Sequence, residues 1–369
     1  MNNILKYITI IFFIGFIFII PITTLITPDK KISELENKVL KSFPELSFES
    51  IKSKRFMKNF DIYVSDQFPI RERFLNIKNS YNYLIGNREF RNIYIDKNGR
   101  LMEKFIFNED IMYKNISKAI NLSKHLSDNY KIKSKLIIIP TSIAFYKNNL
   151  PNYAISDSQT DAIKFINSNL KHTNLSFYTP YNILNKNKDK YIYFYTDHHW
   201  TQLGAKLAYE DMYNTKVSND SYLKVSDNFY GTYFSKVMIS KIKSDSIYAY
   251  QDFNKFNINI DFYENFNTLY DNSRLKGKNK YQYFLHGDPA IAVIEGNKNI
   301  DKEVLIFKDS YAHNFIPFLT NNYSKIHIVD PRYYNLNLDD YLNKNNNISE
   351  ILFINNIQTF NNEFLYKKL

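Results

Sequence analysis

The chain begins with a long apolar run and continues with alternating apolar and amphipathic stretches. The run from Ile8 to Ile26 contains no charged residue, and its length is close to the roughly 20 residues that span a bilayer. No small-x-small cleavage signal follows it. We therefore expect an uncleaved signal anchor over residues 1–27, with a cleaved signal peptide as the alternative. Residues 28–55 are polar and contain Pro28 and Pro44, which indicates a membrane-proximal stalk.

Helical periodicity next extends from Phe56 to Ile85, and Pro69 divides it into two helices. Residues 92–102 predict a β-hairpin around Asn98-Gly99, because this pair tolerates the positive φ of a tight turn. Residues 108–129 then predict a third helix.

Short apolar strings alternate with helical periods in the rest of the chain. The strings predict buried strands of a parallel sheet, at 135–140, 175–178, 304–307, 325–329 and 350–354. Helices are expected between them, at 157–169, 203–213 and 311–319. This alternation predicts an α/β fold. We expect residues 56–369 to form one domain, in which residues 215–300 are an insertion over the cleft with short strands at 246–250 and 261–264.

Composition narrows the class of protein. Hydrophobic residues make up 44% of the 369 residues, which is enough for a large core. The absence of cysteine excludes disulfides and thiolate metal sites. A net charge of +11 raises the question of nucleic acid. The lysines are interleaved with Asp and Asn, however, and no nucleic-acid-binding module is present, so a solvated surface near anionic polymers or lipids is favoured.

The stretch Tyr195 to Thr201 concentrates residues that carry chemistry. It contains Asp197, His198, His199 and the only tryptophan of the chain, Trp200. An aspartate two residues before a histidine suits a loop in which the carboxylate orients the imidazole and stabilises its protonated form. We predict that Asp197 and His199 act in this way. His198 is either a packing histidine or a substrate contact. Trp200 is either part of the core or cleft wall, or a platform for a sugar.

The strongest nucleophile candidate is Ser310, which follows the strand predicted at 304–307. A serine at a strand-to-helix turn lies near the positive end of the helix dipole, and it becomes a good nucleophile when a histidine takes its proton. Ser142, after the strand at 135–140, is a rival. The backbone N–H groups of Ser310 and Tyr311 are expected to stabilise an oxyanion.

Two residues near later strand ends complete the candidate site. Asn355 follows the last predicted strand and could supply a side-chain donor to the oxyanion, or could simply end the strand. Arg332 follows the strand at 325–329, and could hold an anionic substrate or pair with Asp330.

These motifs resemble the DHHW family, which is related to the alginate O-acetylation proteins, SGNH-hydrolase-like acyltransferases of the bacterial cell envelope. The resemblance rests on Asp-His-His-Trp at 197–200 with Thr-x-x-Gly-Ala at 201–205, and on Asp309-Ser310-Tyr311 after a strand. Asp66 to Glu72 and Val329 to Tyr333 add to it. Lys308 stands where the usual SGNH motif has glycine. The resemblance implies a three-layer SGNH-like fold and a catalytic triad of Ser310, His199 and Asp197.

The order of the motifs and the setting of the family add further expectations. Ordinary SGNH enzymes have the serine block first and the histidine block last, so the resemblance implies a circularly permuted order here. It also implies acetyl transfer through an acetyl-serine onto an exopolysaccharide or cell-wall glycan. The catalytic domain would lie outside the cell membrane on a single-pass anchor, with a membrane-bound O-acyltransferase as the partner that supplies acetyl. No cofactor is expected.

Three alternatives stay open. A carbohydrate acetyl esterase would use the same triad, and a non-catalytic polysaccharide-binding assembly subunit would keep the fold without the reaction. A metal site at Asp197, His198 and His199 is the third. It is disfavoured because adjacent side chains on a strand point to opposite faces, and metal analysis of the purified protein would distinguish it.

Overall fold

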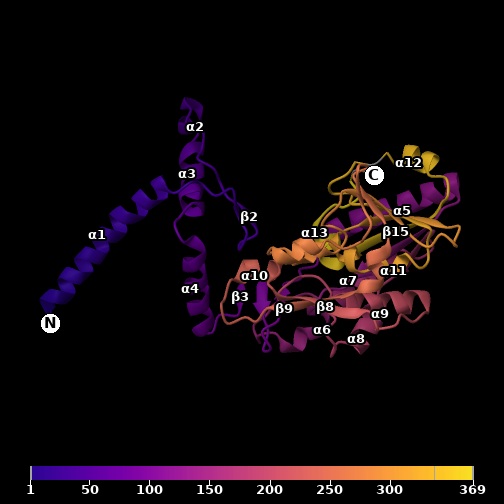
Figure 1. The fold of residues 1–369 in the computed structure, drawn as a ribbon, viewed down its shortest axis with the longest axis horizontal. Helices are drawn as coiled ribbons and strands as arrows, with labels where there is room; N and C mark the ends of the chain where they lie inside the picture. The colour runs from indigo at the N-terminus through magenta and orange to yellow at the C-terminus, as the bar shows by residue number, and fades with distance from the viewer. Residues whose placement is uncertain (1, 336, 368–369) are drawn as a thin grey trace. The chain divides into compact units, whose positions relative to one another are not determined.

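The computed structural model describes residues 2–335 and 337–367. The chain forms two compact units (Figure 1): Met1–Phe90 with Phe234–Ile242, and Arg91–Tyr233 with Lys243–Leu369. This division differs from the predicted boundary at residue 55, because the helices that follow residue 55 group with the N-terminal segment.

The first unit is helical. Helix α1 (Asn2–Ile26) contains a 21-residue stretch, Ile4–Thr24, that is long and apolar enough to cross a membrane by length and composition, with a mean hydropathy of 2.4. The helix pair predicted around Pro69 is confirmed as α3 (Arg55–Asp66) and α4 (Arg71–Leu84). Short strands β1 (Ile32–Ser33) and β2 (Lys38–Val39) pair in the segment that connects α1 to helix α2 (Phe48–Lys52).

The second unit is built on an eight-stranded sheet with the order β11-β10-β12-β14-β13-β15-β6-β7. Five neighbouring strands are parallel: β14 (Lys325–Val329), β13 (Glu303–Lys308), β15 (Ile348–Asn356), β6 (Lys133–Ile139) and β7 (Leu175–Tyr178). Each coincides with a predicted strand. The prediction of a parallel sheet therefore holds for these five strands, and the whole sheet is mixed.

The remaining strands of the sheet come from the predicted insertion. They are antiparallel: β10 (Ile258–Ile260), β11 (Glu264–Phe266) and β12 (Ile291–Glu295). The strand predicted at 261–264 is wrong, because this segment forms the turn between β10 and β11, where Asp261 and Phe262 have φ of 51° and 70°. The predicted strand at 246–250 is confirmed within β9 (Asp245–Tyr250), which pairs with β8 (Tyr222–Phe229) outside the large sheet.

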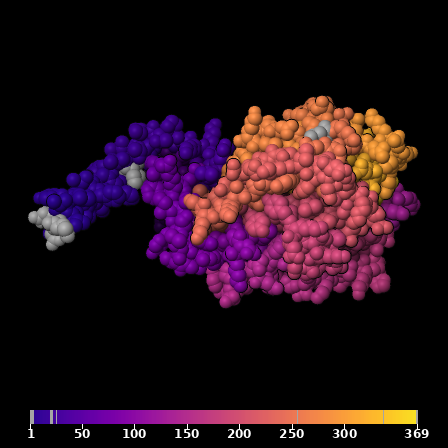
Figure 2. All heavy atoms as spheres, turned by 60° about the horizontal axis from the view of Figure 1, so that its bottom comes forward, coloured from indigo at the N-terminus to yellow at the C-terminus, as the bar shows by residue number. Residues whose placement is uncertain are grey.

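Helices and the β8–β9 hairpin cover both faces of the sheet, which gives three layers. One face packs against α5 (Glu109–Tyr130), α7 (Gln159–Asn169) and α13 (Ile357–Asn362). The other packs against α9 (Gln202–Tyr213), α11 (Ile316–Leu319) and β9. Alternate residues of β13 enter the two cores, which is why the strand is apolar throughout. The space-filling view shows the segments that form this second unit packed closely together (Figure 2).

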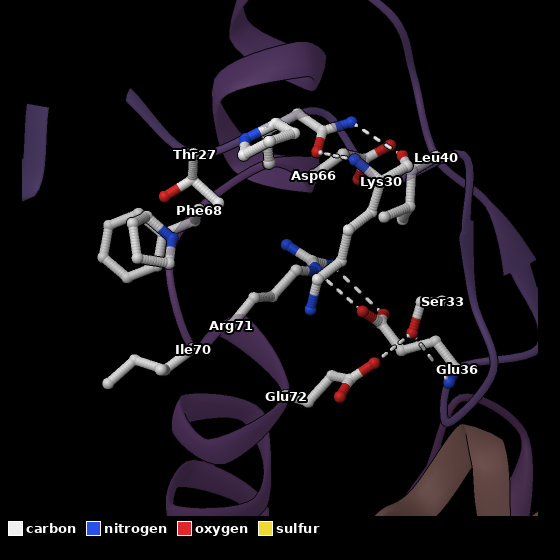
Figure 3. A pocket seen from close by; sticks show the side chains of 13 residues that line it. Thr27, Lys30, Ser33, Glu36, Leu40, Asp66, Phe68, Ile70, Arg71 and Glu72 are labelled. Atoms are coloured by element: carbon white, nitrogen blue, oxygen red, sulfur yellow. Dashed lines mark hydrogen bonds and ion pairs between the residues drawn. The ribbon is translucent and has the colours of Figure 1, made fainter. Parts of the chain in front are cut away.

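Charged side chains line a pocket of about 270 Å³ in the first unit, and several of them are paired. Figure 3 shows the Arg71 guanidinium beside the Glu36 carboxylate, to which Nε donates at 2.7 Å and Nη2 at 3.2 Å. The Ser33 hydroxyl donates to Glu72 at 2.6 Å. Nearby, Lys38 Nζ lies 2.5 Å from Asp66 Oδ1. The Asp66–Glu72 piece thus clamps the segment that follows α1 onto α3 and α4.

Glu36→Ala tests this clamp. The Arg71 guanidinium is mostly buried, so losing its carboxylate partner should destabilise the clamp by about 1–3 kcal/mol. In hydrogen–deuterium exchange of the full-length protein in detergent micelles, the amides of residues 31–41 should exchange about tenfold faster or more. Glu45→Ala, at an exposed position of the same segment, should leave them unchanged. Equal exchange in the two variants would show that the pair does not hold this segment.

Candidate active site

A tight chain reversal carries the Asp-His-His-Trp motif. Tyr193 and Trp200 form an antiparallel bridge, and the Phe194 N–H donates to the His199 carbonyl at 3.3 Å. The Thr201 hydroxyl caps α9 by accepting from the Gly204 N–H at 3.4 Å. The bridge and the cap fix both sides of the loop, so Asp197 and His199 are held in irregular but well-supported backbone.

This loop brings its histidine to Ser310, at the carboxyl end of β13. His199 Nε2 lies 2.8 Å from Ser310 Oγ, and His199 Nδ1 lies 2.5 Å from Asp197 Oδ1. Since both ring nitrogens are used, the imidazole is aligned between the hydroxyl and the carboxylate. The structure therefore joins the three residues of the predicted triad in one hydrogen-bonded chain; their catalytic role stays a prediction.

The Asp197 carboxylate is almost fully buried and accepts from several donors. Oδ1 also accepts from the His199 N–H at 3.0 Å, and Oδ2 accepts from the Thr232 N–H at 2.8 Å and hydroxyl at 3.2 Å. Burial alone would raise its pKa, but His198, His199 and these hydrogen bonds hold the pKa of Asp197 far below its usual value. The carboxylate therefore stays ionised and can orient the His199 ring.

His198 lies beside the base and not against the predicted nucleophile. Its Nδ1 is 2.6 Å from the Thr232 hydroxyl, and burial together with His199 lowers the pKa of its imidazole, although Asp197 opposes the change. The two histidine rings are 3.6 Å apart, so the expectation that adjacent side chains point to opposite faces is wrong for this loop. Asp197, His198 and His199 have ligand atoms within 4.8 Å of one another, but both nitrogens of His199 are already used in the triad.

The turn after β13 differs from the predicted helix over 311–319. Ser310–Asn314 form a 3₁₀ turn, and the four-residue helix α11 follows. Pro317 has no N–H, so an α-helical ladder cannot pass through it. The Tyr311 N–H donates to Asp309 Oδ1 at 2.9 Å. In this arrangement the Tyr311 amide is therefore engaged and does not face an oxyanion, which corrects the expectation for that group.

The side chains of Tyr311 and Trp200 support the histidine loop. The Tyr311 hydroxyl donates to the His198 carbonyl, and its ring lies 5.2 Å from that of His199. Trp200 is fully buried, and its indole N–H donates to the Tyr311 carbonyl at 2.8 Å. For Trp200 this burial favours core or cleft wall over a sugar platform.

Asn355 and Arg332 have other partners. The Asn355 side-chain oxygen Oδ1 accepts from the Tyr366 hydroxyl, and Tyr366 belongs to the core on the face opposite the one that contains Trp200 and Tyr311. The Asn355 Nδ2 group, which is the predicted donor, is buried and has no hydrogen-bond partner within residues 2–335 and 337–367, so its role toward an oxyanion stays a prediction. No hydrogen bond between Asn355 and the triad is found in the part of the chain that is described. Arg332 binds Asp330 with Nε and Nη2, at 2.9 Å and 2.7 Å, which decides between its two predicted roles in favour of the ion pair.

Lys308, His313 and Asp330 form a buried charged cluster near Ser310 in the chain, which the sequence did not predict. Lys308 is fully buried, and its Nζ lies 2.9 Å from His313 Nε2 and 3.4 Å from Asp330 Oδ2. Burial lowers the pKa of Lys308 while Asp330 opposes this, and burial and Lys308 together hold the pKa of His313 well below its usual value. Lys308 is not among the described residues with positive φ, so the lysine fits the turn without backbone strain.

The tautomer of His313 follows from this contact. A lysine ammonium can only donate, so Nε2 of the neutral ring accepts and the proton is assigned to Nδ1. That buried Nδ1 has no hydrogen-bond partner within residues 2–335 and 337–367. The spacing of three residues from Ser310 is the sequence signal that could have drawn attention to His313.

Tyr281 and Thr232 also belong to the site and were missed. The Tyr281 ring stacks on the His199 ring at 3.6 Å and 7°, and its hydroxyl donates to the Ser310 carbonyl at 3.0 Å. Both residues lie within 215–300, where the polar and apolar pattern is weak and indicates no contact with the motif loop.

The family can now be compared with this geometry. A model of the DHHW protein family matches residues 98–329. The chain belongs to the DHHW family. This confirms the resemblance carried by the two motifs. No curated protein sequence matches the chain.

Solved structures share the fold of this DHHW chain. A DHHW family protein from Eubacterium siraeum DSM 15702 aligns with a TM-score of 0.60 and 23% identity, over 73% of this chain and 92% of that one. Bacillus cereus PatB1 aligns with a TM-score of 0.61 and 18% identity, over 75% and 99%. The O-acetyltransferase domain of Pseudomonas putida AlgJ is more distant, with a TM-score of 0.46 and 13% identity over 73% and 92%.

Gly231→Ala tests how tightly the loop is packed around Asp197. A Cβ at residue 231 would lie 2.6 Å from Asp197 Cα and would also collide with the Asp197 side chain. We expect the variant to lose about 1–3 kcal/mol of stability through this overpacking, measured by thermal unfolding of the purified full-length protein.

Gly277→Ala is the matched control. The nearest atom to its added Cβ is the Arg274 carbonyl oxygen at 3.8 Å, so this variant should change stability by no more than about 0.5 kcal/mol. Equal unfolding temperatures for the two variants would contradict the close packing at Gly231.

Proposed function

We propose that this protein is an extracytoplasmic O-acetyltransferase that moves acetyl groups onto hydroxyls of an exopolysaccharide or cell-wall glycan. Ser310 is the nucleophile, His199 the general base and Asp197 the group that orients it. The observation that carries the proposal is the chain of two hydrogen bonds, 2.8 Å and 2.5 Å long, from Ser310 through His199 to Asp197.

The proposed reaction has two steps with the same histidine. His199 Nε2 takes the Ser310 hydroxyl proton while Oγ bonds to the acetyl carbonyl carbon, and the departing group receives that proton when its bond breaks. A sugar hydroxyl then attacks the acetyl-serine and gives its proton to His199. Oγ leaves the acetyl carbon and takes the proton back, which restores the free enzyme. The ionised Asp197 stabilises the imidazolium in both steps.

His313 is the proposed side-chain donor for the oxyanion. In a 3₁₀ turn, side chains three residues apart lie on the same side, so His313 lies over Ser310 in the turn Ser310–Asn314. Its ring also stacks on Tyr281 at 6.1 Å and 20°, and Tyr281 in turn covers His199. The unpartnered Nδ1–H of a neutral imidazole is suited to bind developing negative charge. The Ser310 N–H would be the backbone donor.

The setting of the reaction is part of the proposal. Helix α1 supports a single-pass anchor in the cell membrane, with the catalytic unit outside and a membrane-bound O-acyltransferase supplying acetyl. The permuted SGNH-like assignment is part of the proposal and rests on the motifs. The chain shares its fold with PatB1, and a structure of that protein carries a sulfonyl adduct. An acetyl esterase with the same triad is the second candidate, because the hydrogen-bonded chain serves hydrolysis equally well.

Ser310→Ala tests the nucleophile, and Ser142→Ala is its matched control. No hydrogen bond from Ser142 to a histidine is present among the residues described. With a chromogenic acetyl ester, wild type and Ser142→Ala should release acetate and gain the mass of one acetyl group. Ser310→Ala should gain none, and its turnover should fall by roughly 10⁴–10⁶-fold. A sulfonyl fluoride should label the same two proteins and spare Ser310→Ala.

Oligosaccharide acceptors then separate the candidate functions. Acetylated sugar product supports the transferase, whereas acetate release that acceptors leave unchanged supports the esterase. An acetyl adduct that persists in Ser310→Ala would exclude this serine. No adduct and no turnover with several acetyl donors would favour the non-catalytic polysaccharide-binding subunit.

His313→Ala tests the oxyanion donor. We expect the rate constant of acetyl-enzyme formation to fall by about 10²–10³-fold, with little change in the ester concentration at half-maximal rate, because the lost hydrogen bond forms mainly in the transition state. His313→Asn, which keeps a side-chain N–H, should recover part of the rate. His125→Ala, at a half-exposed position on α5, should behave as wild type. An unchanged rate in His313→Ala would remove this residue from the mechanism.

A further inference from the structure

A polar cleft of about 510 Å³ opens beside the motif loop of the second unit. Its lining includes three tyrosines and two charged side chains from separate segments, namely Tyr146, Tyr191, Tyr195, Asp96 and Arg100. Tyr195 immediately precedes Thr196-Asp197, and its carbonyl accepts from the Leu101 N–H at 2.8 Å. The cleft is therefore connected to the triad through a few residues of rigid backbone.

The aromatic rings of the cleft are fixed before any ligand binds. The Arg100 guanidinium lies over Tyr146 at 4.2 Å and over Tyr195 at 3.9 Å. Its Nη1 also donates to the carbonyls of Tyr193 and Phe194, both at 3.0 Å. Tyr195 further stacks on Tyr191 at 6.2 Å and 22°. With 36% of its surface exposed, Tyr195 presents preorganised aromatic surface beside the Arg100 and Tyr191 contacts, which reduces the entropy lost on binding.

Asp96 leaves one carboxylate oxygen unused beside these rings. The residue is 4% exposed, and its Oδ1 accepts from the Asn98 N–H at 2.7 Å and the Arg100 N–H at 2.8 Å. Oδ2 is buried and has no partner in the described part of the chain. A buried acceptor without a donor is costly, so a ligand with hydroxyl or amide donors would satisfy it.

We propose that this cleft is a binding subsite for a glycan chain, with a pyranose ring against the exposed surface of Tyr195 and its hydroxyls donating to Asp96 Oδ2. Sugars suit this lining because they present C–H groups on one face and hydroxyl donors at the edge. The inference rests on the proposed function, and it deepens it by naming where the acceptor polymer is held. The four Cα–Cα steps from Tyr195 to His199 span at most about 14 Å, so an oligomer of two or more sugars could occupy the cleft and reach the triad.

Binding of defined oligosaccharides to the full-length protein in detergent micelles tests the proposal. Titration calorimetry would use Ser310→Ala as the parent protein, so that no turnover occurs, with chitohexaose, a mannuronate hexamer and cellohexaose as separate probes. At least one probe should bind. The hexosamine probe represents a cell-wall glycan and the other two represent exopolysaccharides, so the preferred probe also indicates the source of the acceptor.

The cleft variants decide the result. Tyr195→Ala and Asp96→Asn, each made in the Ser310→Ala parent, should raise the Kd of the bound probe tenfold or more. Asp96→Asn keeps an oxygen for the turn amides and replaces only the second acceptor. Tyr263→Ala, at a 79% exposed tyrosine between β10 and β11, should bind like the parent.

Two results would overturn the subsite: no binding of any probe, or cleft variants that bind like the parent. Both can be told apart from failure of the proposed function. If wild type binds a probe through Tyr195 and Asp96 but never acetylates it, the subsite stands and the transferase does not.

Discussion

The ionised, buried Asp197 carboxylate is the constraint on which the site depends. Its four hydrogen bonds come from the His199 ring and amide and from the Thr232 amide and hydroxyl. A buried charge is tolerated when it is paired and hydrogen-bonded. If one of these donors moved away, the buried carboxylate would lose part of its stabilisation, so their positions are coupled. The close approach of Gly231 allows the second pair of donors to reach the carboxylate. The position of one aspartate thus couples the motif loop to a segment 35 residues later.

The alignment of the His199 imidazole depends on these contacts of Asp197. The hydrogen bond to Asp197 holds Nδ1 in place, and the rings of Tyr281 and Tyr311 limit rotation of the His199 imidazole. A second buried polar cluster is formed by the Lys308 ammonium, the His313 imidazole and the Asp330 carboxylate. These groups contact one another away from solvent. Ser310 is therefore hydrogen-bonded to the His199–Asp197 pair and lies two residues after Lys308 in the chain.

The fold was largely predictable where the apolar pattern is regular. All five parallel strands and the helix pair at Pro69 agree with the structure, because burial on both faces and the chemistry of proline leave a strong local signal. The hairpin predicted around Gly99 is also found, as β4 (Ile93–Ile95) paired with β5 (Leu101–Glu103). Between residues 215 and 300 the strand at 246–250 was predicted correctly, but the strands at 258–266 were misplaced, since they are short and alternate weakly. The residues of the predicted triad were recognisable from local motifs, whereas Thr232 and Tyr281 make contacts that neither spacing nor composition encodes. For His313 the spacing from Ser310 was the one available signal. The Tyr311 amide was misjudged because the competing acceptor, Asp309, is its own near neighbour.

Strand order has a consequence for how this molecule is made. Strand β15 lies between β13 and β6 in the sheet, although it is the last of the three along the chain. Until residues 348–356 arrive, the edges of β6 and β13 have no partner on that side, and the serine turn lacks the Asn356 groups that hold Asp309 at 2.7 Å and 2.8 Å. Such non-local pairing slows folding. A chain delivered from its N-terminus therefore passes through a stage in which residues 195–201 have been made and the turn that carries Ser310 is not yet held in place.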